Sequence, residues 1–182
     1  MQIRNALEVP MPPDEAWSFL MNIPSTVPCF PGAELVETID ENNYKGRVTV
    51  KLGPLTMVFN GKLRIEERNE AAHSGTVKAT WTEAKGRGNA TTVTRFAMSA
   101  HEAGTAIEID TDVQLAGQVA QYGRGAGMIS GISKQLVSQF AENLRASIDA
   151  EGADSVSARS EIHALTLLGR AVAGRFKRDT DR

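Results

Sequence analysis

The sequence predicts an α+β fold in which helices pack on one face of a curved antiparallel sheet. Short segments with period-two alternation, separated by turn residues, fill most of the chain before residue 116. Such alternation is typical of an antiparallel sheet with one buried and one solvent-exposed face. A long amphipathic pattern follows, with Ile129, Leu136, Phe140 and Leu144 at helical spacing. A helix of about 20 residues spans roughly 30 Å, which is enough to cross a small domain.

The N-terminal part is expected to form a strand, a short helix and a loop. Gln2–Val9 alternates and ends in a run of prolines. Asp14 is the expected N-cap of the short helix. The helix is expected to contain Ala16, Trp17, Phe19, Leu20 and Ile23. The proline-bracketed loop Val27–Gly32 carries Phe30, which is predicted to be either a core plug or a lip over a cavity.

A meander of strands fills the middle of the chain. The expected strands are Glu34–Ile39, Tyr44–Leu52, Leu55–Asn60 continued by Lys62–Arg68, Thr76–Thr82, Ala90–Ala100 and Thr105–Leu115. Their apolar positions alternate with polar ones, so each strand presents one apolar face. One long helix cannot fill the concave side of such a sheet, and the inward residues are therefore expected to line a hollow.

Eleven residues are the candidates for the wall of this cavity. A packed core is an equally good interpretation for most of them, because an apolar pocket wall and a core look alike in sequence. Trp81 is the preferred candidate, since it leads into the glycine-rich loop Glu83–Asn89. The candidates are Phe30, Leu55, Met57, Phe59, Trp81, Phe96, Met98, Tyr122, Met128, Ile129 and Ile132.

Composition excludes several classes of protein. The 182 residues suit one domain with an appendage, and a net charge of −2 with 5% aromatic residues does not suit a nucleic-acid-binding protein. The single cysteine, Cys29, fits a reducing compartment. The sequence shows neither a signal peptide nor an apolar run of about 18 residues. A cytoplasmic location is expected.

The chain offers no recognisable catalytic or metal-binding motif. His73, His101 and His163 have no motif partners and are interpreted as solvated or incidental. Cys29 is expected to be a small buried residue. Glu108, Asp110 and Asp112 share one strand face, and a solvated face explains them better than a metal site. We therefore predict no catalytic residue, no metal and no cofactor.

Glycines precede the long helix. Gly123, Gly125 and Gly127 lack the βαβ context of a nucleotide-binding loop. Gly123, Gly127 and Gly131 would instead form a smooth helical ridge. Close backbone packing and a flexible cavity mouth are equally good explanations for this ridge.

The C-terminal region is expected to be separate from the domain. The predicted organisation is a domain over residues 1–150, a linker over 151–159 and a basic amphipathic tail over 160–182. The tail is expected to bind a membrane or a partner protein, or to be disordered. Its apolar stripe and basic side chains include Leu165, Leu168, Val172, Phe176, Arg170, Arg175, Lys177 and Arg178.

Several stretches together resemble a known family. They are MPPDEAWSFL at Met11–Leu20, VPCFPGAEL at Val27–Leu35, the segment Tyr44–Ile65, and two segments between Asp112 and Leu144. The chain resembles the CoxG family of carbon monoxide dehydrogenase subunits, within the START-like (SRPBCC, helix-grip) superfamily. The resemblance covers roughly residues 1–148 and implies a seven-stranded sheet that grips a long C-terminal helix around an apolar cavity.

The resemblance also implies a function. It suggests a non-enzymatic accessory protein of a molybdenum hydroxylase such as carbon monoxide dehydrogenase. Such a protein would bind a lipid or a membrane quinone and recruit the enzyme to the inner face of the cytoplasmic membrane. The alternatives are a START-like cyclase or hydrolase acting on an apolar substrate, and a purely structural assembly factor. The enzyme alternative needs a polar dyad inside the cavity, and the strands show no inward-facing pair of titratable residues.

Overall fold

Seven antiparallel strands form a single sheet. The computed structural model describes residues 1–52, 55–123 and 129–147, and residues Met1–Arg145 form one compact unit. The elements are β1 (Gln2–Val9), α1 (Pro13–Met21), α2 (Ile23–Thr26), the 3₁₀ helix η1 (Val27–Cys29), β2 (Ala33–Thr38), β3 (Asn43–Leu52), β4 (Leu55–Asn69), β5 (Ser74–Glu83), β6 (Gly88–His101), β7 (Gly104–Gly117), α3 (Ala120–Gly123) and a helix over residues 129–147.

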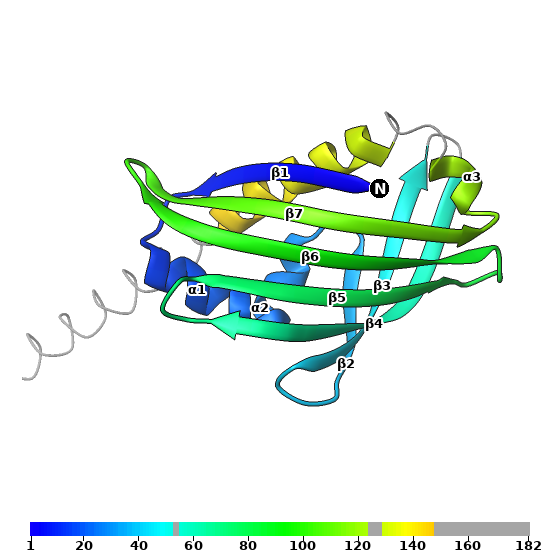
Figure 1. Cartoon of the computed structure of the whole chain (residues 1–182), viewed down its shortest axis with the longest axis horizontal. Coiled ribbons are helices and arrows are strands. Elements are labelled where there is room, and N and C mark those ends of the chain that lie inside the picture. The colour runs from blue at the N-terminus through cyan, green and yellow to red at the C-terminus, as the bar shows by residue number, and fades with distance from the viewer. Residues whose placement is uncertain (53–54, 124–128, 148–182) are drawn as a thin grey trace, which may run out of the picture. The chain divides into compact units, whose positions relative to one another are not determined.

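The strand order is β1-β7-β6-β5-β4-β3-β2 (Figure 1). From β2 to β7 each strand pairs with its neighbour in the sequence, as tight turns between alternating segments predict. The first strand, β1, pairs with the last, so Gln2 lies opposite Asp112. The predicted antiparallel meander is therefore confirmed, and β1 and β2 are its two edges.

The strand register places the predicted apolar faces on one side of the sheet. One row across five strands runs through Ile3, Thr111, Thr94, Val77 and Ile65. Because side chains alternate between faces, the residues two positions away along each strand form parallel rows on the same side. The period-two pattern thus identified the inner face of each strand correctly.

The short helix α1 differs from the prediction at both ends. Pro12 is the N-cap residue, and the helix starts at Pro13 because proline at the first position is already in a helical φ. Asp14 lies in the first turn, so the prediction that it caps the helix was wrong. Ile23 belongs to the separate helix α2, which Asn22 caps through its side chain.

His73 has a structural role that the sequence did not indicate. Its ring packs against the buried Trp17 of α1, with the centroids 5.8 Å apart. Its Nε2 lies 2.9 Å from Oδ1 of Asp14. The interpretation of His73 as a solvated residue was therefore wrong, because it ties the β4–β5 turn to α1. His101 is exposed, as expected, and its Nε2 lies 3.6 Å from Oε1 of Glu8.

The long helix predicted from Ile129 is confirmed over residues 129–147. Its C-terminal half is the more deeply packed part, with Phe140 and Leu144 3% and 1% exposed. Two polar contacts fasten the helix to the edge strand. Asn5 donates to the Ser133 hydroxyl at 2.8 Å, and Arg145 donates to the Glu8 carbonyl at 2.9 Å.

The glycine ridge is described only at Gly131. A Cβ added there would meet no heavy atom within 4 Å, so close backbone packing does not explain this glycine. The other ridge positions, and the whole segment from residue 151 to 182 with its linker and tail, lie outside the residues whose side chains are described.

Replacing Leu144 with alanine tests how strongly the helix is bound to the sheet. Leu144→Ala should lower the free energy of unfolding by about 2–5 kcal/mol, because a buried leucine loses its contacts and leaves a cavity. Urea unfolding measures this change. The exposed Gln139→Ala on the same helix is the control and should change stability by less than about 0.5 kcal/mol. Equal effects of the two substitutions would contradict this packing.

Candidate ligand pocket

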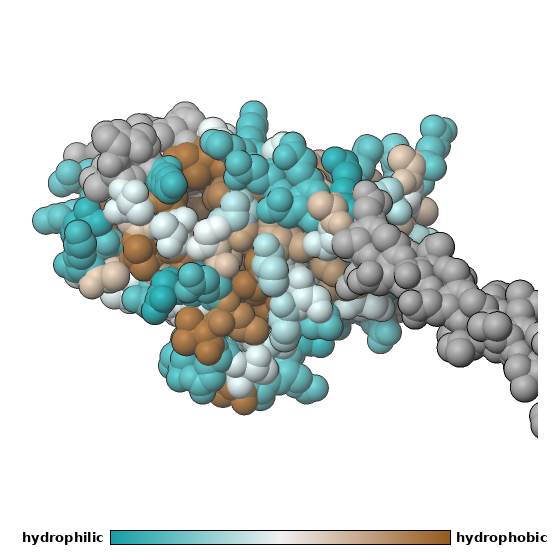
Figure 2. Space-filling view, turned by 180° about the vertical axis from the view of Figure 1, so that it is seen from behind, coloured by the Kyte–Doolittle hydropathy of each residue, from teal (hydrophilic) through white to brown (hydrophobic). Residues whose placement is uncertain are grey.

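A pocket lies between the inner face of the sheet and the long helix. Its volume is about 430 Å³. The side of the molecule opposite to the view of Figure 1 has hydrophobic residues at the surface, in patches among hydrophilic ones (Figure 2). The lining residues are Ile3, Phe30, Val48, Val50, Met57, Phe59, Trp81, Ala90, Thr92, Thr94, Thr111, Val113, Leu115, Val119, Ile129, Ile132, Ser133 and Leu136.

The structure brings six of the eleven candidate residues together in this pocket. They are Phe30, Met57, Phe59, Trp81, Ile129 and Ile132. Phe96 and Met98 face the same side of the sheet but do not line the pocket. Phe96 instead packs against Trp17 of α1, with ring centroids 6.0 Å apart. Phe96 is half-buried beneath α1, and Met98 is a buried core residue.

The remaining three candidates are not described at the level of their side chains. Leu55 begins β4 and Tyr122 lies in α3, but only their backbone positions are described. Met128 lies outside the described residues altogether.

Trp81 forms part of the pocket wall because two glycines leave room for its indole. Gly46 and Gly61 lie opposite each other on β3 and β4, and Gly61 lies opposite Trp81 on β5. A Cβ on Gly61 would come within 2.5 Å of the indole Cε3, and a Cβ on Gly46 within 3.8 Å of Cη2. The indole therefore lies flat over the backbone of two neighbouring strands.

Phe30 lies at the rim of the pocket. It is 42% exposed, lines the pocket, and stacks on Phe140 with centroids 4.1 Å apart and planes at 19°. The carbonyl of the preceding Cys29 accepts a hydrogen bond from Asn143 at 3.0 Å. Of the two interpretations of this loop, the exposure of Phe30 favours a lip rather than a core plug. Cys29 itself is buried, as expected.

Sequence reasoning missed the smaller lining residues. Thr92, Thr94 and Thr111 occupy inward positions of β6 and β7, and Ser133 faces the same space from the helix. Period-two alternation already marks these strand positions as inward. The candidate list favoured large apolar side chains, so it left out the hydroxyl-bearing residues.

Glu83 is a buried acid that the sequence suggested to be part of a polar loop. It ends β5 on the same face as Trp81, and its side chain is 1% exposed. Arg87 donates to Oε1 at 2.7 Å, and the backbone N–H groups of Lys85 and Arg87 donate to Oε2. These bonds, that of the Arg87 side chain first, lower the pKa of Glu83 to about 2.

The Glu83–Arg87 pair does not contradict the expectation that the strands carry no titratable pair inside the cavity, because Arg87 lies in the turn between β5 and β6. Neither residue lines the pocket, although Val119, which does, donates its N–H to the Arg87 carbonyl at 3.2 Å. The pair orders the β5–β6 turn. The carboxylate already accepts three hydrogen bonds and its pKa is lowered, so it is poorly suited to act as a general base.

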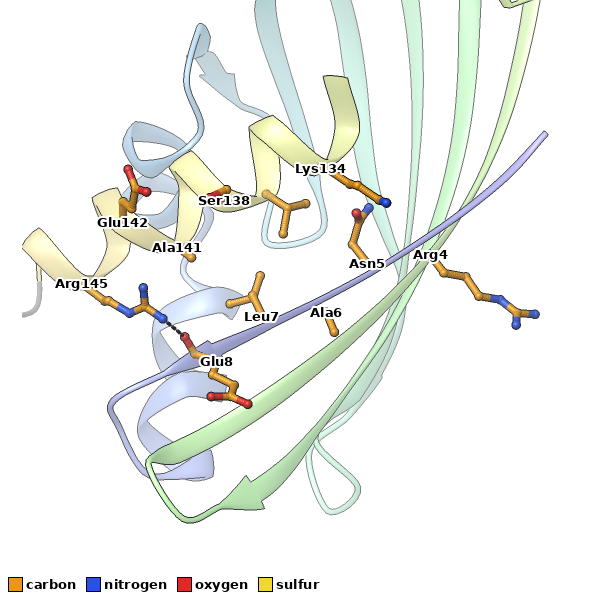
Figure 3. A pocket seen from close by; sticks show the side chains of 11 residues that line it. Arg4, Asn5, Ala6, Leu7, Glu8, Lys134, Ser138, Ala141, Glu142 and Arg145 are labelled. Carbon is orange, nitrogen blue, oxygen red and sulfur yellow. Dashed lines mark hydrogen bonds between the residues drawn. The ribbon is translucent and has the colours of Figure 1, made fainter. Parts of the chain in front are cut away.

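A second, polar groove runs between β1 and the long helix (Figure 3). Its volume is about 440 Å³. Asn5 points toward the helix, whereas Arg4 points away from it (Figure 3). The bond between Asn5 and Ser133 lies where this groove adjoins the apolar pocket, since Asn5 lines the first and Ser133 the second.

The outer face of the sheet carries paired charges. Oδ2 of Asp110 lies 3.3 Å from Nε of Arg4, and Oδ2 of Asp112 lies 2.9 Å from Nη1 of Arg95. Among the described residues, no group of three or more His, Cys, Asp or Glu side chains is placed to hold a metal ion. Within the same residues, no helix combines the length and apolar character needed to cross a bilayer.

The sequence matches a family model described as a carbon monoxide dehydrogenase subunit (CoxG), over residues 6–149. A search of curated protein sequences gave no match.

Several solved structures share the fold. A conserved protein from Geobacillus kaustophilus superposes with a TM-score of 0.71 at 18% identity, covering 82% of this chain and 96% of its own. An aromatase/cyclase from a Streptomyces species has a TM-score of 0.54 at 12% identity, with 82% and 93% covered. A START superfamily protein from Mycobacterium smegmatis has a TM-score of 0.53 at 14% identity, with 82% and 97% covered.

The buried acid generates a prediction about pH. A carboxyl whose pKa is lower in the folded than in the unfolded protein stabilises the fold above its unfolded pKa. That stability is lost as the pH falls toward the folded pKa. For Glu83 the window runs from 4.5, its ordinary pKa, down to about 2. Glu83→Gln should be less stable than the unmodified protein at pH 7, and the difference should shrink across this window.

Thermal unfolding midpoints measured from pH 7 to pH 2 provide the comparison. Glu102→Gln, in the exposed β6–β7 turn, is the matched control and should follow the unmodified protein at every pH. A constant offset between Glu83→Gln and the unmodified protein over the whole range would show that the ionised carboxylate is not the stabilising form.

Proposed function

Because the chain belongs to the CoxG family of carbon monoxide dehydrogenase subunits, we propose that it is a non-enzymatic accessory protein of a molybdenum hydroxylase of the carbon monoxide dehydrogenase type. In this proposal the pocket binds an apolar ligand, either a lipid or a membrane quinone, and the protein recruits the enzyme to the membrane. The partner is inferred from the family name, and the class of ligand from the chemistry of the pocket wall.

The observation that carries the ligand proposal is the composition of the pocket lining. Fourteen of the eighteen lining residues are aliphatic, aromatic or methionine, and the other four carry only hydroxyl groups. A volume of about 430 Å³ falls in the range of roughly 300–1,000 Å³ that is usual for small-molecule sites. Apolar surface removed from water contributes about 25 cal/mol per Å², so a hydrocarbon chain is the natural occupant.

The pocket would be closed further when it is occupied. The inner wall is formed by paired strands, while Phe30 lies at the rim with 42% of its surface exposed. We propose that the ligand is enclosed between the sheet and the helix, with Phe30 covering part of it. Enclosure would increase the apolar area that the ligand buries.

The tail is proposed to provide membrane contact. On a helical wheel its apolar residues, such as Leu168 and Phe176, form one stripe, and most of its basic residues fall on the opposite side. Each basic residue near an anionic surface contributes about 1 kcal/mol, which supports reversible attachment. We therefore propose a peripheral location on the inner face of the cytoplasmic membrane.

The enzyme alternative is less well supported. The aromatase/cyclase shares the fold at 12% identity, which carries no activity over to this chain. The described titratable pair, Glu83 and Arg87, does not line the pocket, so it is not placed to act on an occupant. A purely structural assembly factor is the third candidate, and it differs from the first by having a pocket that binds nothing.

Filling the pocket tests the ligand proposal. Titration with decylubiquinone or a fatty alcohol, followed by tryptophan fluorescence, should show saturable binding to the unmodified protein. Ala90→Phe places a ring in the pocket and should weaken this binding roughly tenfold or more, a factor that corresponds to about 1.4 kcal/mol. Ala97→Phe, on the outer face of the same strand, is the matched control and should bind normally. Binding that is absent, or unchanged in Ala90→Phe, would refute a ligand in this pocket.

Removing the tail tests the membrane proposal. The full-length chain should float with anionic vesicles in a density gradient, and a chain ending at residue 150 should remain in the dense fractions. A full-length variant with glutamine at Arg170, Arg175, Lys177 and Arg178 should float less than the unmodified protein with the same vesicles, because it loses the electrostatic contribution. Equal flotation of the full-length and shortened chains would remove the tail from the proposal.

A further inference from the structure

Polar side chains gather on one part of the inner face of the sheet and on the long helix that faces it. Thr94 and Thr111 lie opposite each other on β6 and β7, with their hydroxyl oxygens 3.1 Å apart. Thr92 occupies the next inward position of β6. One inward position further along, Asn5 of β1, which lies opposite Ile109, donates to Ser133 of the long helix at 2.8 Å. Thr92, Thr94, Thr111 and Ser133 line the pocket, and we call these residues with Asn5 the hydroxyl row.

The hydroxyl row lies at one end of the pocket. The next inward pair along the same strands is Phe96 and Ile109, and Phe96 packs against Trp17. The core beneath α1 therefore begins directly beyond Thr94 and Thr111. Trp81 and Leu115 line the opposite part of the pocket, nearer the ends of β5 and β7. The pocket thus has a polar inner end and an apolar remainder.

The hydroxyl row has hydrogen-bonding capacity beyond the bonds that it forms within the described residues. A hydroxyl group carries one donor proton and two acceptor lone pairs. The bond between Thr94 and Thr111 uses one of their two protons. A second proton and several lone pairs are therefore left for a group in the pocket. Polar groups on an apolar surface are stabilised when such a partner is present.

The pocket lining carries no charge among its described residues. An ionised head group entering it would lose its hydration without gaining an ionic partner, which is strongly unfavourable. Glu83, the nearest buried acid, already has its partner in Arg87. An uncharged oxygen loses much less hydration free energy than an ion, and hydrogen bonds to the hydroxyl groups of the row would offset that loss. The lining therefore distinguishes ligands by charge and by the presence of an oxygen.

We propose that the hydroxyl row binds the uncharged carbonyl or hydroxyl oxygen of an amphipathic ligand whose apolar part lies against Trp81. The pocket then selects uncharged amphiphiles over carboxylates of the same chain length. This inference rests on the proposed function, since it requires that the pocket holds a ligand. It adds the orientation of the ligand, with its polar end inward, and the side chains that determine specificity.

Displacement of the uncharged dye N-phenyl-1-naphthylamine by 1-decanol and by decanoate at pH 8 tests the proposal. The full-length protein should release the dye at a concentration of decanol at least about tenfold lower than that of decanoate. The double variant Thr94→Val/Thr111→Val keeps nearly the same shape. Relative to its affinity for the dye, it should bind decanol about 3- to 10-fold more weakly than the unmodified protein does, as expected for one lost hydrogen bond. Thr91→Val, on the outer face of β6, is the matched control and should behave like the unmodified protein.

The outcomes separate the inference from the function on which it rests. If the dye binds, and decanol and decanoate displace it equally, the selectivity is refuted while an apolar pocket stands. The same conclusion follows if the double variant retains full decanol affinity. If neither dye nor decanol binds to the unmodified protein, the proposed ligand function fails and the inference fails with it. Circular dichroism of each variant verifies that the fold is retained.

Discussion

A concave seven-stranded sheet is wider than one helix. This difference in width explains why the molecule has both a packed core and a pocket. The helix over residues 129–147 is buried where it meets the core at Phe140, Ala141 and Leu144. Its first half, with Ile132 and Leu136, is only half-buried and lines the pocket instead. The same helix therefore stabilises the fold with one half and forms the wall of a pocket with the other. The two functions are separated along its length rather than around its circumference.

Charges are kept away from the apolar space. On the outer face they pair across strands, as Arg95 does with Asp112 and Lys45 with Glu37. Such exposed pairs contribute little to stability, at most about 1 kcal/mol each, but they keep one face of the sheet hydrated. Glu83, the one acid named above as buried, is bonded by Arg87 and two backbone amides. The space between sheet and helix is left neutral as a result.

The sequence predicted which residues face inward far better than which of them meet. Alternation alone placed Met57, Trp81 and Val113 on the inner face, because the side-chain period of a strand is two. That Gly46 and Gly61 lie side by side beneath Trp81, or that Thr94 meets Thr111, depends on the register between strands. The sequence alone does not show this register, because the alternation within one strand does not reveal which residue of the next strand lies opposite. The burial of Glu83 was not predicted for the same reason, because it depends on a turn that brings Arg87 next to the carboxylate.

Gly46 and Gly61, which lie beneath the Trp81 indole, limit how the pocket can vary between related proteins. At Gly61 a methyl group would collide with both the indole and the backbone carbonyl of Thr80, so this position tolerates no side chain without a shift of the strand. At Gly46 the nearest atoms are the Glu34 carbonyl oxygen at 3.2 Å and the indole at 3.8 Å, and a small side chain needs only a slight adjustment. One glycine is therefore a fixed structural requirement, and its neighbour is a position at which natural variation can adjust the depth of the pocket. Related chains that accommodate occupants of different thickness should differ at the second position while keeping the first.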